Sequence, residues 1–526
     1  MKPTLLYHPD GSSRPVAHSQ EIELTDLTPN FGSANFSDTS TLTGRSFATL
    51  QLRAKNAVRA LLHSAHEQIL VICGNSRVDE LQTAVDLVTA LSQLKPVVAR
   101  AARKEQLLGK NGQGGLIHGF GVLILPCALL CDHPKWIGPL SAALHDNPAI
   151  KLILCGSGTD CADLSLFWPE LDYALHADLV FEFPASDGIN LVGQLLACYQ
   201  KRLQVKACSV EAVELFCRLA TRQSGDRRWL GIAERTLHSL LTQADKYAKG
   251  ALIDAKAVLK AFAAADFRVN FLAESELREH RDQQLLIATQ GAAIGQVNGL
   301  SVVETFGSSY EFGEPVRITA TLRAGGEGDV IDIERKAELA GQIHAKAMMI
   351  INGYLMKEFG AEQPLPVSAS LVFEQSYSEI DGDSASLTGL CAVLSCLAGV
   401  PIRQDLALTG SVDQFGHVQP VGGVNEKIEG FFKVCRLHGL TGSQGVVIPE
   451  TCVPQLVLRP AVVRAVKQGK FHLYTVSHVT DAIELLTTVP WGSKEEQGTI
   501  AQRIVERMAQ IGQSGHNERP WWKFWE

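Results

Sequence analysis

Short apolar runs alternate with amphipathic helical stretches between residues 46 and 204, and this alternation constrains the fold more than any other feature. The apolar runs at residues 68–74, 121–126, 150–156 and 178–183 have the length and composition of buried strands. Stretches with helical periodicity lie between them, for example residues 77–94. Because strands that alternate with helices along a chain build a parallel, wound sheet, we expect an α/β domain here.

Length and charge set limits on the rest of the protein. A chain of 526 residues exceeds one hydrophobic core, so we expect several domains. The composition is that of a globular protein, with 46% hydrophobic residues and a net charge of −8. This mild acidity argues against nucleic acid as the main partner, because phosphate binding needs a basic surface.

No segment predicts a leader or a membrane span. The amino terminus lacks the apolar core of a signal peptide. The longest apolar runs, residues 120–131 and 390–400, are shorter than the roughly 20 residues that a spanning helix needs. The twelve cysteines lie mostly in apolar segments and form no CxxC pair, so we expect neither a zinc site nor a disulfide framework. These observations predict a cytoplasmic protein without a membrane partner.

Changes in pattern divide the chain into five parts. Residues 1–45 are rich in Ser, Thr, Pro and Asn without periodicity, which predicts a flexible arm before the α/β domain. Residues 205–268 show helical patterns throughout, and Ser209 and Asp254 are expected to cap two of the helices. Residues 269–490 carry short strands, glycine turns and amphipathic helices, which predicts an α+β domain.

The fifth part, residues 491–526, begins as a helix and ends in the aromatic sequence WWKFWE. The helix carries four apolar residues on one face: Ile500, Ile504, Met508 and Ile511. Two interpretations of the aromatic tail are open, a disordered end and a segment that docks on a partner or a neighbouring subunit. We favour docking, because exposing three tryptophans and a phenylalanine together is costly in solubility.

The α/β domain lacks the residues that usually hold a nucleotide. The turn at residues 73–81 has one glycine and no Gly-Lys-Ser/Thr sequence, so it cannot cradle a triphosphate in the usual way. The Gly-Lys pair within residues 107–115 lacks the upstream glycine and the hydroxyl for magnesium. The second strand ends in Pro126 and Cys127, where an ATPase carries an Asp-Glu pair. We therefore expect no ATP, magnesium or other cofactor.

The segment EIDGDSASLTGL, residues 379–390, places Ser384 after two aspartates at the start of an apolar run. Asp381, Asp383 and Ser384 are all residue types that cap a helix, and the apolar run behind them predicts a buried helix. The alternative is a serine nucleophile at a helix start, where free N–H groups stabilise an oxyanion. Taken alone, the segment favours the cap.

A serine nucleophile needs a base that takes its proton. The local histidines are His344, inside a predicted helix, and His417, in a predicted turn, and we interpret both as structural. Lys427 stands in the first turn of a predicted amphipathic helix, where apolar neighbours and the helix dipole would lower the pKa of its amine. Without further observations, a solvated helix lysine is the simpler interpretation of this residue.

Three long motifs change the balance between these interpretations. Residues 296–320, residues 381–386 (DGDSAS) and residues 408–432 (LTGSVDQFGHVQPVGGVNEKIEGFF) strongly resemble the protease domain of the Lon family, most closely its Lon-B type. The resemblance covers about residues 270–490. It implies that Ser384 is the nucleophile, that Lys427 is the base and that Thr409 hydrogen-bonds near this lysine. For Asp383 we expect a supporting role in the loop.

The amino-terminal half resembles the degenerate AAA+ region of the YcbZ-like Lon homologues of bacteria. The resemblance implies a degenerate AAA+-like wound sheet, a small all-helical domain and an α+β Lon-type protease domain. It further implies a serine endopeptidase that forms a homo-oligomer, a hexameric ring, and cleaves unfolded or flexible protein. Since both nucleotide motifs are missing, we expect cleavage without ATP hydrolysis. The alternative is a non-catalytic binding or adaptor protein with a Lon protease fold, which the intact Ser384, Lys427 and Thr409 disfavour.

Overall fold

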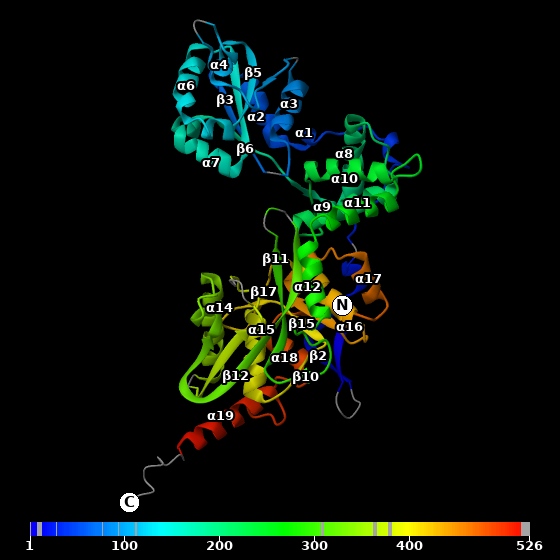
Figure 1. The fold of residues 1–526 in the computed structure, drawn as a ribbon, viewed down its shortest axis with the longest axis vertical. Coiled ribbons are helices and arrows are strands. Elements are labelled where there is room, and N and C mark those ends of the chain that lie inside the picture. The colour runs from blue at the N-terminus through cyan, green and yellow to red at the C-terminus, as the bar shows by residue number, and fades with distance from the viewer. Residues whose placement is uncertain are drawn as a thin grey trace, which may run out of the picture. The chain divides into compact units, whose positions relative to one another are not determined.

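The chain divides into two compact units in its computed structural model (Figure 1). The structure describes residues 2–7, 13–27, 29–75, 77–92, 94–110, 113–305, 307, 310–360, 365–376 and 381–516. One unit runs from Asn30 to Ala265, and the other combines residues 1–29 with residues 266–526. The aromatic tail at residues 521–526, for which we predict docking, lies outside the described residues.

A five-stranded parallel sheet forms the centre of the unit from Asn30 to Ala265, as the alternating pattern predicts. Its strands have the spatial order β4-β5-β6-β3-β7. Their bounds are β3 Ile69–Gly74, β4 Val97–Val98, β5 Gly121–Pro126, β6 Ile150–Ser157 and β7 Leu175–Asp178. The prediction of a strand at residues 178–183 is wrong, because the strand of this sheet, β7, lies just before them and ends at Asp178. The residues that follow form β8 (Glu182–Pro184), which pairs with β9 (Trp229–Gly231).

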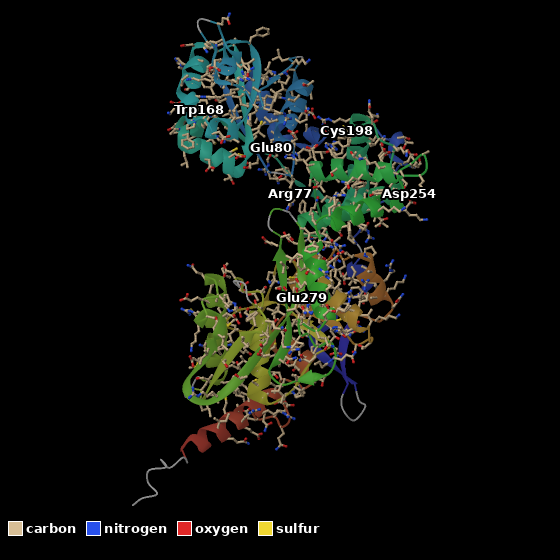
Figure 2. All side chains as sticks on the ribbon, viewed as in Figure 1. Arg77, Glu80, Trp168, Cys198, Asp254 and Glu279 are labelled. Carbon is tan, nitrogen blue, oxygen red and sulfur yellow. The ribbon has the colours of Figure 1, made fainter. Side chains whose placement is uncertain are left out.

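Helices accompany the sheet and then make up the rest of this unit. Around the sheet they are α1 Phe47–Leu50, α2 Leu52–His63, α3 Glu80–Leu91, α4 Lys104–Leu108, α5 Cys127–Cys131, α6 Ile137–Asp146 and α7 Gly158–Phe167. They continue as α8 Gly188–Leu203, α9 Val210–Ser224, α10 Glu234–Tyr247 and α11 Ala255–Phe267. The predicted caps are confirmed, since Ser209 accepts from the amide of Ala212 and Asp254 from the amide of Ala257 (Figure 2).

The other unit contains a mixed eight-stranded sheet with the order β1-β2-β19-β18-β15-β11-β12-β13. The bounds are β1 Lys2–Tyr7, β2 Ser13–Glu21, β11 Gln296–Glu304, β12 Glu311–Asp332, β13 Val367–Phe373, β15 Leu406–Leu408, β18 Gly445–Pro449 and β19 His472–Val476. Strand β12 is antiparallel to both β11 and β13. Strand β15 is parallel to both β11 and β18, and β18 is parallel to β19. Two short ribbons pair β10 (Ala292–Ala293) with β14 (Ile402–Arg403) and β16 (Ser411–Val412) with β17 (Val418–Gln419).

The helices of this unit are α12 Phe271–Arg281, α13 Ile333–Lys336, α14 Gln342–Phe359, α15 Ser386–Ala398, α16 Val424–His438, α17 Pro460–Lys467, α18 Val479–Thr487 and α19 Ile500–His516. Helix α15 is buried along its whole length, between strands of the sheet and the helices α14, α18 and α19. Helix α19 packs its predicted apolar face, with Ile500 and Ile504 fully buried, into the same core as α15. Within the described residues, no helix is long and apolar enough to cross a membrane.

The amino-terminal segment differs from the flexible arm predicted for residues 1–45. Strand β2 pairs with β19 at the register Gln20↔Thr475 and Glu21↔Tyr474. Ile22 and Leu27 are then buried against the core that surrounds α16. The segment forms a strand because its backbone pairs with β19, more than 450 residues away in sequence. The Thr475 hydroxyl also donates a hydrogen bond to the carbonyl oxygen of Gln20. Composition alone carries no sign of such a partner.

Candidate active site

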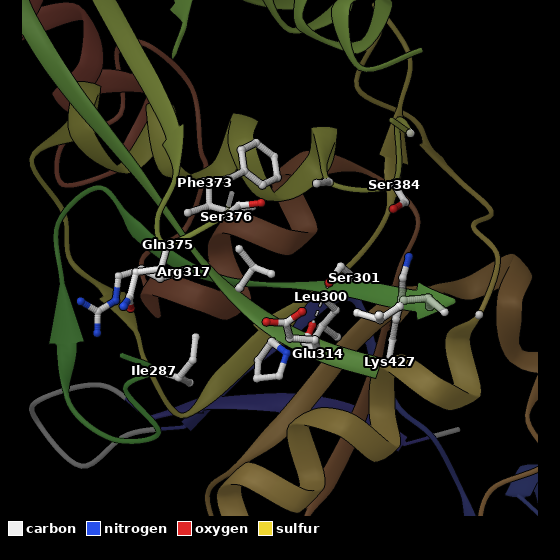
Figure 3. A pocket seen from close by; sticks show the side chains of 18 of the residues that line it. Ile287, Leu300, Ser301, Glu314, Arg317, Phe373, Gln375, Ser376, Ser384 and Lys427 are labelled. Atoms are coloured by element: carbon white, nitrogen blue, oxygen red, sulfur yellow. Dashed lines mark hydrogen bonds between the residues drawn. The ribbon is translucent and has the colours of Figure 1, made fainter. Parts of the chain in front are cut away.

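Ser384 and Lys427 line one pocket of about 710 Å³ in the unit that contains the mixed sheet. Ser384 lies on the turn before α15, and Lys427 lies in the first turn of α16. The lining also includes residues of β11, β12 and β13. Figure 3 shows the Lys427 amine directed toward Ser384 across the pocket. The two residues that the sequence pairs from 43 positions apart therefore meet at one cavity.

The Ser384 turn is held against the connection between β15 and β16. The carbonyl oxygen of Ser384 accepts a hydrogen bond from the amide of Gly410 at 3.0 Å. A second hydrogen bond reaches the same oxygen from Thr409 Oγ1 at 3.3 Å. One residue into α15, Ser386 Oγ accepts from the amide of Val412 at 3.1 Å. These contacts fix the backbone on both sides of the serine, so its hydroxyl has a defined position at the pocket.

The amine of Lys427 is enclosed by the core around α16. The residue is only 3% exposed, and Ile428, Phe431 and Phe432 beside it are buried as well. This burial lowers the pKa of Lys427 to about 8, although the nearby Cys452 and Asp383 oppose the shift. A charged ammonium is poorly solvated in such a site, so the neutral amine is favoured. The amine can therefore accept a proton at a pH close to neutrality.

Thr409 connects the lysine to the serine turn. Its side chain is fully buried, and its hydroxyl accepts a hydrogen bond from Lys427 Nζ at 3.2 Å. The same hydroxyl donates to the Ser384 carbonyl oxygen. Because one hydroxyl binds both partners, it fixes the amine relative to the backbone of the serine. The structure thus brings Ser384, Lys427 and Thr409 together as the sequence predicts.

Glycines allow the helix of Lys427 to approach the sheet closely. Gly313 on β12 packs directly on the first turn of α16, where a Cβ atom would lie 2.7 Å from the Cα of Lys427. Gly423 precedes α16 with a φ of +65°, a left-handed conformation that favours glycine. A larger residue at either position would displace the turn that carries Lys427.

The two aspartates of the DGDSAS segment have different roles in the structure. Asp381 accepts from the amides of Ile343 at 2.9 Å and His344 at 3.3 Å, so it caps α14 and not the helix that follows it in sequence. Asp383 accepts a hydrogen bond from Ser411 Oγ at 2.9 Å. This bond joins the serine turn to β16. The structural interpretation of both aspartates agrees with these contacts.

The start of α15 differs from the arrangement expected for a helix that carries Ser384. Ala385 occupies the N-cap position and makes no side-chain cap, so Ser384 is not the cap. The amide of Ser386 donates to Asp383 O and that of Leu387 donates to Gly410 O. We expected the first amides of this helix to face an oxyanion, and for these two amides that expectation is wrong. Contacts within the protein already occupy them.

The two histidines considered as bases lie elsewhere. His344 is buried in α14, and its Nε2 is 3.3 Å from Asp332 Oδ2. His417 lies in the turn between β16 and β17, with its Nδ1 3.0 Å from Asp413 Oδ2. Neither histidine is among the residues that line the Ser384 pocket. The structural interpretation of both is confirmed.

Other groups of the same pocket escaped the sequence analysis. Glu314 on β12 lines it, together with His280 on α12 and Arg317 on β12. Glu314 has the same strand phase as the buried Phe312 and Ile318, so its carboxylate faces inward from a half-buried position. A charged residue in phase with buried apolar residues is the signal that could have identified it.

In the unit from Asn30 to Ala265, protein groups occupy the places searched for a nucleotide. A Cβ atom on Gly74, at the end of β3, would lie 3.0 Å from the Cδ of Glu80. Cys127 begins α5 after β5, and its Sγ is 3.8 Å from Cys161 Sγ. The turn after β3 therefore presents a carboxylate where a phosphate would need backbone amides. The end of β5 presents thiols where magnesium would need carboxylates.

Comparisons with known proteins identify the family. Residues 373–488 match the model of the Lon protease C-terminal proteolytic domain. A protein named as a Lon protease homolog in Escherichia coli is 37% identical over 512 residues, which cover 89% of this chain and 87% of that protein. The corresponding protein of Haemophilus influenzae is 41% identical and covers 78% of this chain and 73% of its own length. An archaeal Lon protease of Archaeoglobus fulgidus is 26% identical and covers 80% of this chain and 61% of its own length. The matched segment contains Ser384, Thr409 and Lys427, and this chain belongs to the Lon protease family.

Proposed function

We propose that this protein is a serine endopeptidase in which Ser384 is the nucleophile and Lys427 the general base. The observation that carries the proposal is the buried Lys427 amine, which is hydrogen-bonded to Thr409 and directed toward Ser384 in one pocket. Burial lowers the pKa of this lysine to about 8, so near neutral pH a fraction of the amine is uncharged and able to accept a proton. Family membership supports the same chemistry.

The proposed reaction has two steps that share the same proton carrier. In the first step, Lys427 Nζ takes the proton of Ser384 Oγ while this oxygen attacks the peptide carbonyl. The lysine then gives that proton to the leaving amine, and an acyl-serine remains. In the second step, water attacks the acyl-serine, Lys427 accepts a proton of the water, and this proton returns to the Ser384 oxygen. Thr409 keeps the amine in place throughout, since its own backbone is fixed to β18 through Val447.

We further propose that the substrates are unfolded or flexible protein segments and that cleavage proceeds without ATP hydrolysis. An extended chain can lie along a pocket bounded by strands, whereas a folded domain cannot enter a cavity of about 710 Å³. The carboxylate of Glu80 and the thiol of Cys127 at the wound sheet support the absence of nucleotide chemistry. Assembly into a hexameric ring is part of the proposal through the family alone.

Cleavage of casein and of a fluorogenic peptide, each with and without Mg-ATP, tests this function. The wild-type protein, Ser384→Ala and Lys427→Ala are compared with Ser443→Ala, which removes an exposed hydroxyl outside the pocket. We expect the first two variants to lose nearly all activity, and the double variant to lose little more, because the residues act as one unit. The control variant should cleave at the wild-type rate, and Mg-ATP should not change that rate.

Two results would contradict the proposal in different ways. Full activity in Lys427→Ala would remove the lysine as base. An inactive wild-type protein that still binds casein would favour the alternative, a binding or adaptor protein that retains the protease fold.

A further inference from the structure

Carboxylates dominate the charged lining of the Ser384 pocket. Five acidic residues line it: Glu304, Glu311, Glu314, Glu374 and Asp381. The permanent cation in the lining is Arg317, because the amine of Lys427 has a pKa of about 8. Contacts within the protein already engage Glu374, which accepts from Thr319 Oγ1, and Asp381, which caps α14. Carboxyl side chains thus outnumber cationic side chains in the lining of the pocket.

Glu314 holds the central position in this charge distribution. It follows Gly313, the residue that packs on the backbone of the Lys427 turn, so its place on β12 is fixed beside that turn. Figure 3 shows the Glu314 side chain in the pocket, near Leu300 and Ser301. No hydrogen bond or ion pair links this carboxylate to another described side chain, and the charges that act on it are those of Glu276 and Glu279. A half-buried carboxylate without a partner is costly, and a cationic ligand would remove that cost.

Helix α12 adds further negative charge behind Glu314. Glu276 and Glu279 lie three residues apart on this helix, and Figure 2 labels Glu279 on it. Burial, and then the charge of Glu279, raise the pKa of Glu314 to about 7. Burial, with Glu314 and Glu279 as the next causes, raises the pKa of Glu276 to about 9, while Lys433 on α16 opposes this shift. These carboxylates repel one another in the unoccupied protein, so a bound cation would stabilise their charged forms.

His280 gives an independent sign of a missing polar ligand. It follows Glu279 on α12, is 2% exposed and lines the pocket. Neither ring nitrogen makes a hydrogen bond of acceptable geometry to the described residues. Burial lowers the pKa of His280 to about 4, and the backbone of Leu285 offsets only part of this shift. The ring is therefore neutral, and one of its nitrogens is an acceptor without a partner among the described side chains.

We propose that Glu314 makes this pocket selective for peptide segments with a lysine or arginine side chain near the cleaved bond, and that His280 accepts a hydrogen bond from the same cationic group. The inference rests on the proposed peptidase function and adds its substrate class. Lysine and arginine side chains present only donors, which matches the carboxylate of Glu314 and a neutral His280 nitrogen as acceptors. A substrate with an acidic side chain at this point would meet repulsion from the same carboxylates.

A series of peptide substrates that differ in one side chain tests the selectivity. A fluorogenic peptide series carries a single lysine, norleucine or glutamate at each position around the cleaved bond, and kcat/KM is measured for each peptide. The variant Glu314→Gln keeps the size of the side chain and removes its charge, whereas Glu314→Lys reverses the charge. Glu506→Gln on α19 is the matched control, since it removes the same charge from an exposed helix position outside the pocket. Melting curves of all variants establish that each one is folded.

The expected result is a preference of about tenfold or more for lysine over norleucine at one position of the peptide. Glu314→Gln should remove most of this preference, mainly through a higher KM for the lysine peptide. Glu314→Lys should shift the preference toward glutamate, and Glu506→Gln should retain the wild-type pattern. His280→Leu should reduce the lysine preference, and His280→Gln, which restores an acceptor, should recover part of it.

The outcomes separate this inference from the function on which it rests. No cleavage of any peptide by the wild-type protein would refute the peptidase function itself. Cleavage with the same preference in wild type and Glu314→Gln would overturn only the role of Glu314. A Glu314 variant could fold and still be inactive, so binding is measured separately. Fluorescence anisotropy gives the affinities of the lysine and norleucine peptides for Ser384→Ala and for the double variant Ser384→Ala, Glu314→Gln. Equal affinities in both proteins would also overturn the inference.

Discussion

Lys427 Nζ donates a hydrogen bond to Thr409 Oγ1 over 3.2 Å in the interior of the protein. The threonine hydroxyl uses its own proton for the carbonyl oxygen of Ser384, so it can act only as an acceptor toward the amine. The orientation of the amine is therefore coupled to the backbone of the residue that it is proposed to deprotonate. This coupling makes Thr409 a positioning residue.

Substitution of Thr409 tests this coupling. Thr409→Val keeps the shape of the side chain but removes the hydroxyl, and we expect kcat to fall about tenfold or more because the amine loses its orientation. Thr409→Ser restores the hydroxyl and should recover most of the activity. Steady-state kinetics of both variants provide the measurement, and a merely structural role would lower stability in both without this difference in kcat.

Activity should depend on pH through the amine of Lys427. Only the neutral amine can accept the serine proton, and burial lowers the pKa of Lys427 to about 8. We therefore expect kcat/KM for a peptide without ionisable groups to rise with pH and to level off above about pH 8 to 9. A pH–rate profile between pH 6 and 10, measured at constant ionic strength, provides the check. A profile that is flat between pH 7 and 9 would contradict the proposed base.

The same burial predicts a cost in stability. The folded protein binds the Lys427 proton less tightly than the unfolded chain, so below about pH 8 the ammonium opposes folding. Lys427→Met removes this cost and retains the aliphatic stem, and we expect it to raise the free energy of unfolding near pH 7 by about 3 kcal/mol. The gain should shrink as the pH rises from 8 through 10.5, because the lysine is neutral in both states only above the pKa of the unfolded chain. Denaturant titration at pH 7 and pH 10 measures it, and an equal or larger gain at pH 10 would be inconsistent with this explanation.

Nucleotide should have no role in the wound-sheet unit. The turn after β3 carries one glycine, and Cys127 follows β5 where an acidic pair would hold magnesium. We predict no measurable ATP hydrolysis, and at most weak binding of Mg-ATP by calorimetry. A tight isotherm, or phosphate release above that of a protein-free blank, would show that other residues of this unit hold the nucleotide.

Local sequence signals predict those elements whose contacts are close in sequence. The periodicities of α9, α10 and α11 predict these helices, and Ser209 and Asp254 cap their helices as expected because a cap involves neighbouring residues. The apolar face of α19 is likewise evident from Ile500 and Ile504. Distant pairing decides the rest. The position of β7 depends on its register with Leu70 to Cys73, which the run at residues 178–183 does not encode.

The active site shows the same division between local and distant contacts. Ser384, Lys427 and Thr409 could be predicted through the family resemblance, whereas the helix that Asp381 caps could not, because α14 precedes this residue by about 40 positions in the chain. The occupied amides of Ser386 and Leu387 also depend on partners in the tertiary structure. The role of Glu314 could not be predicted, because its carboxylate comes near that of Glu279 only when β12 and α12 pack together in the folded protein.

Labelling of the nucleophile tests the central claim most directly. A fluorophosphonate probe reacts with an activated serine hydroxyl, and mass spectrometry of the digested protein identifies the labelled residue. We predict that Ser384 of the wild-type protein is labelled, that the rate rises with pH and levels off above about pH 8 to 9 as Lys427 becomes neutral, and that Lys427→Ala abolishes the label. Labelling of Ser384 at the wild-type rate in Lys427→Ala, or of another serine in the wild-type protein, would contradict the proposed pair.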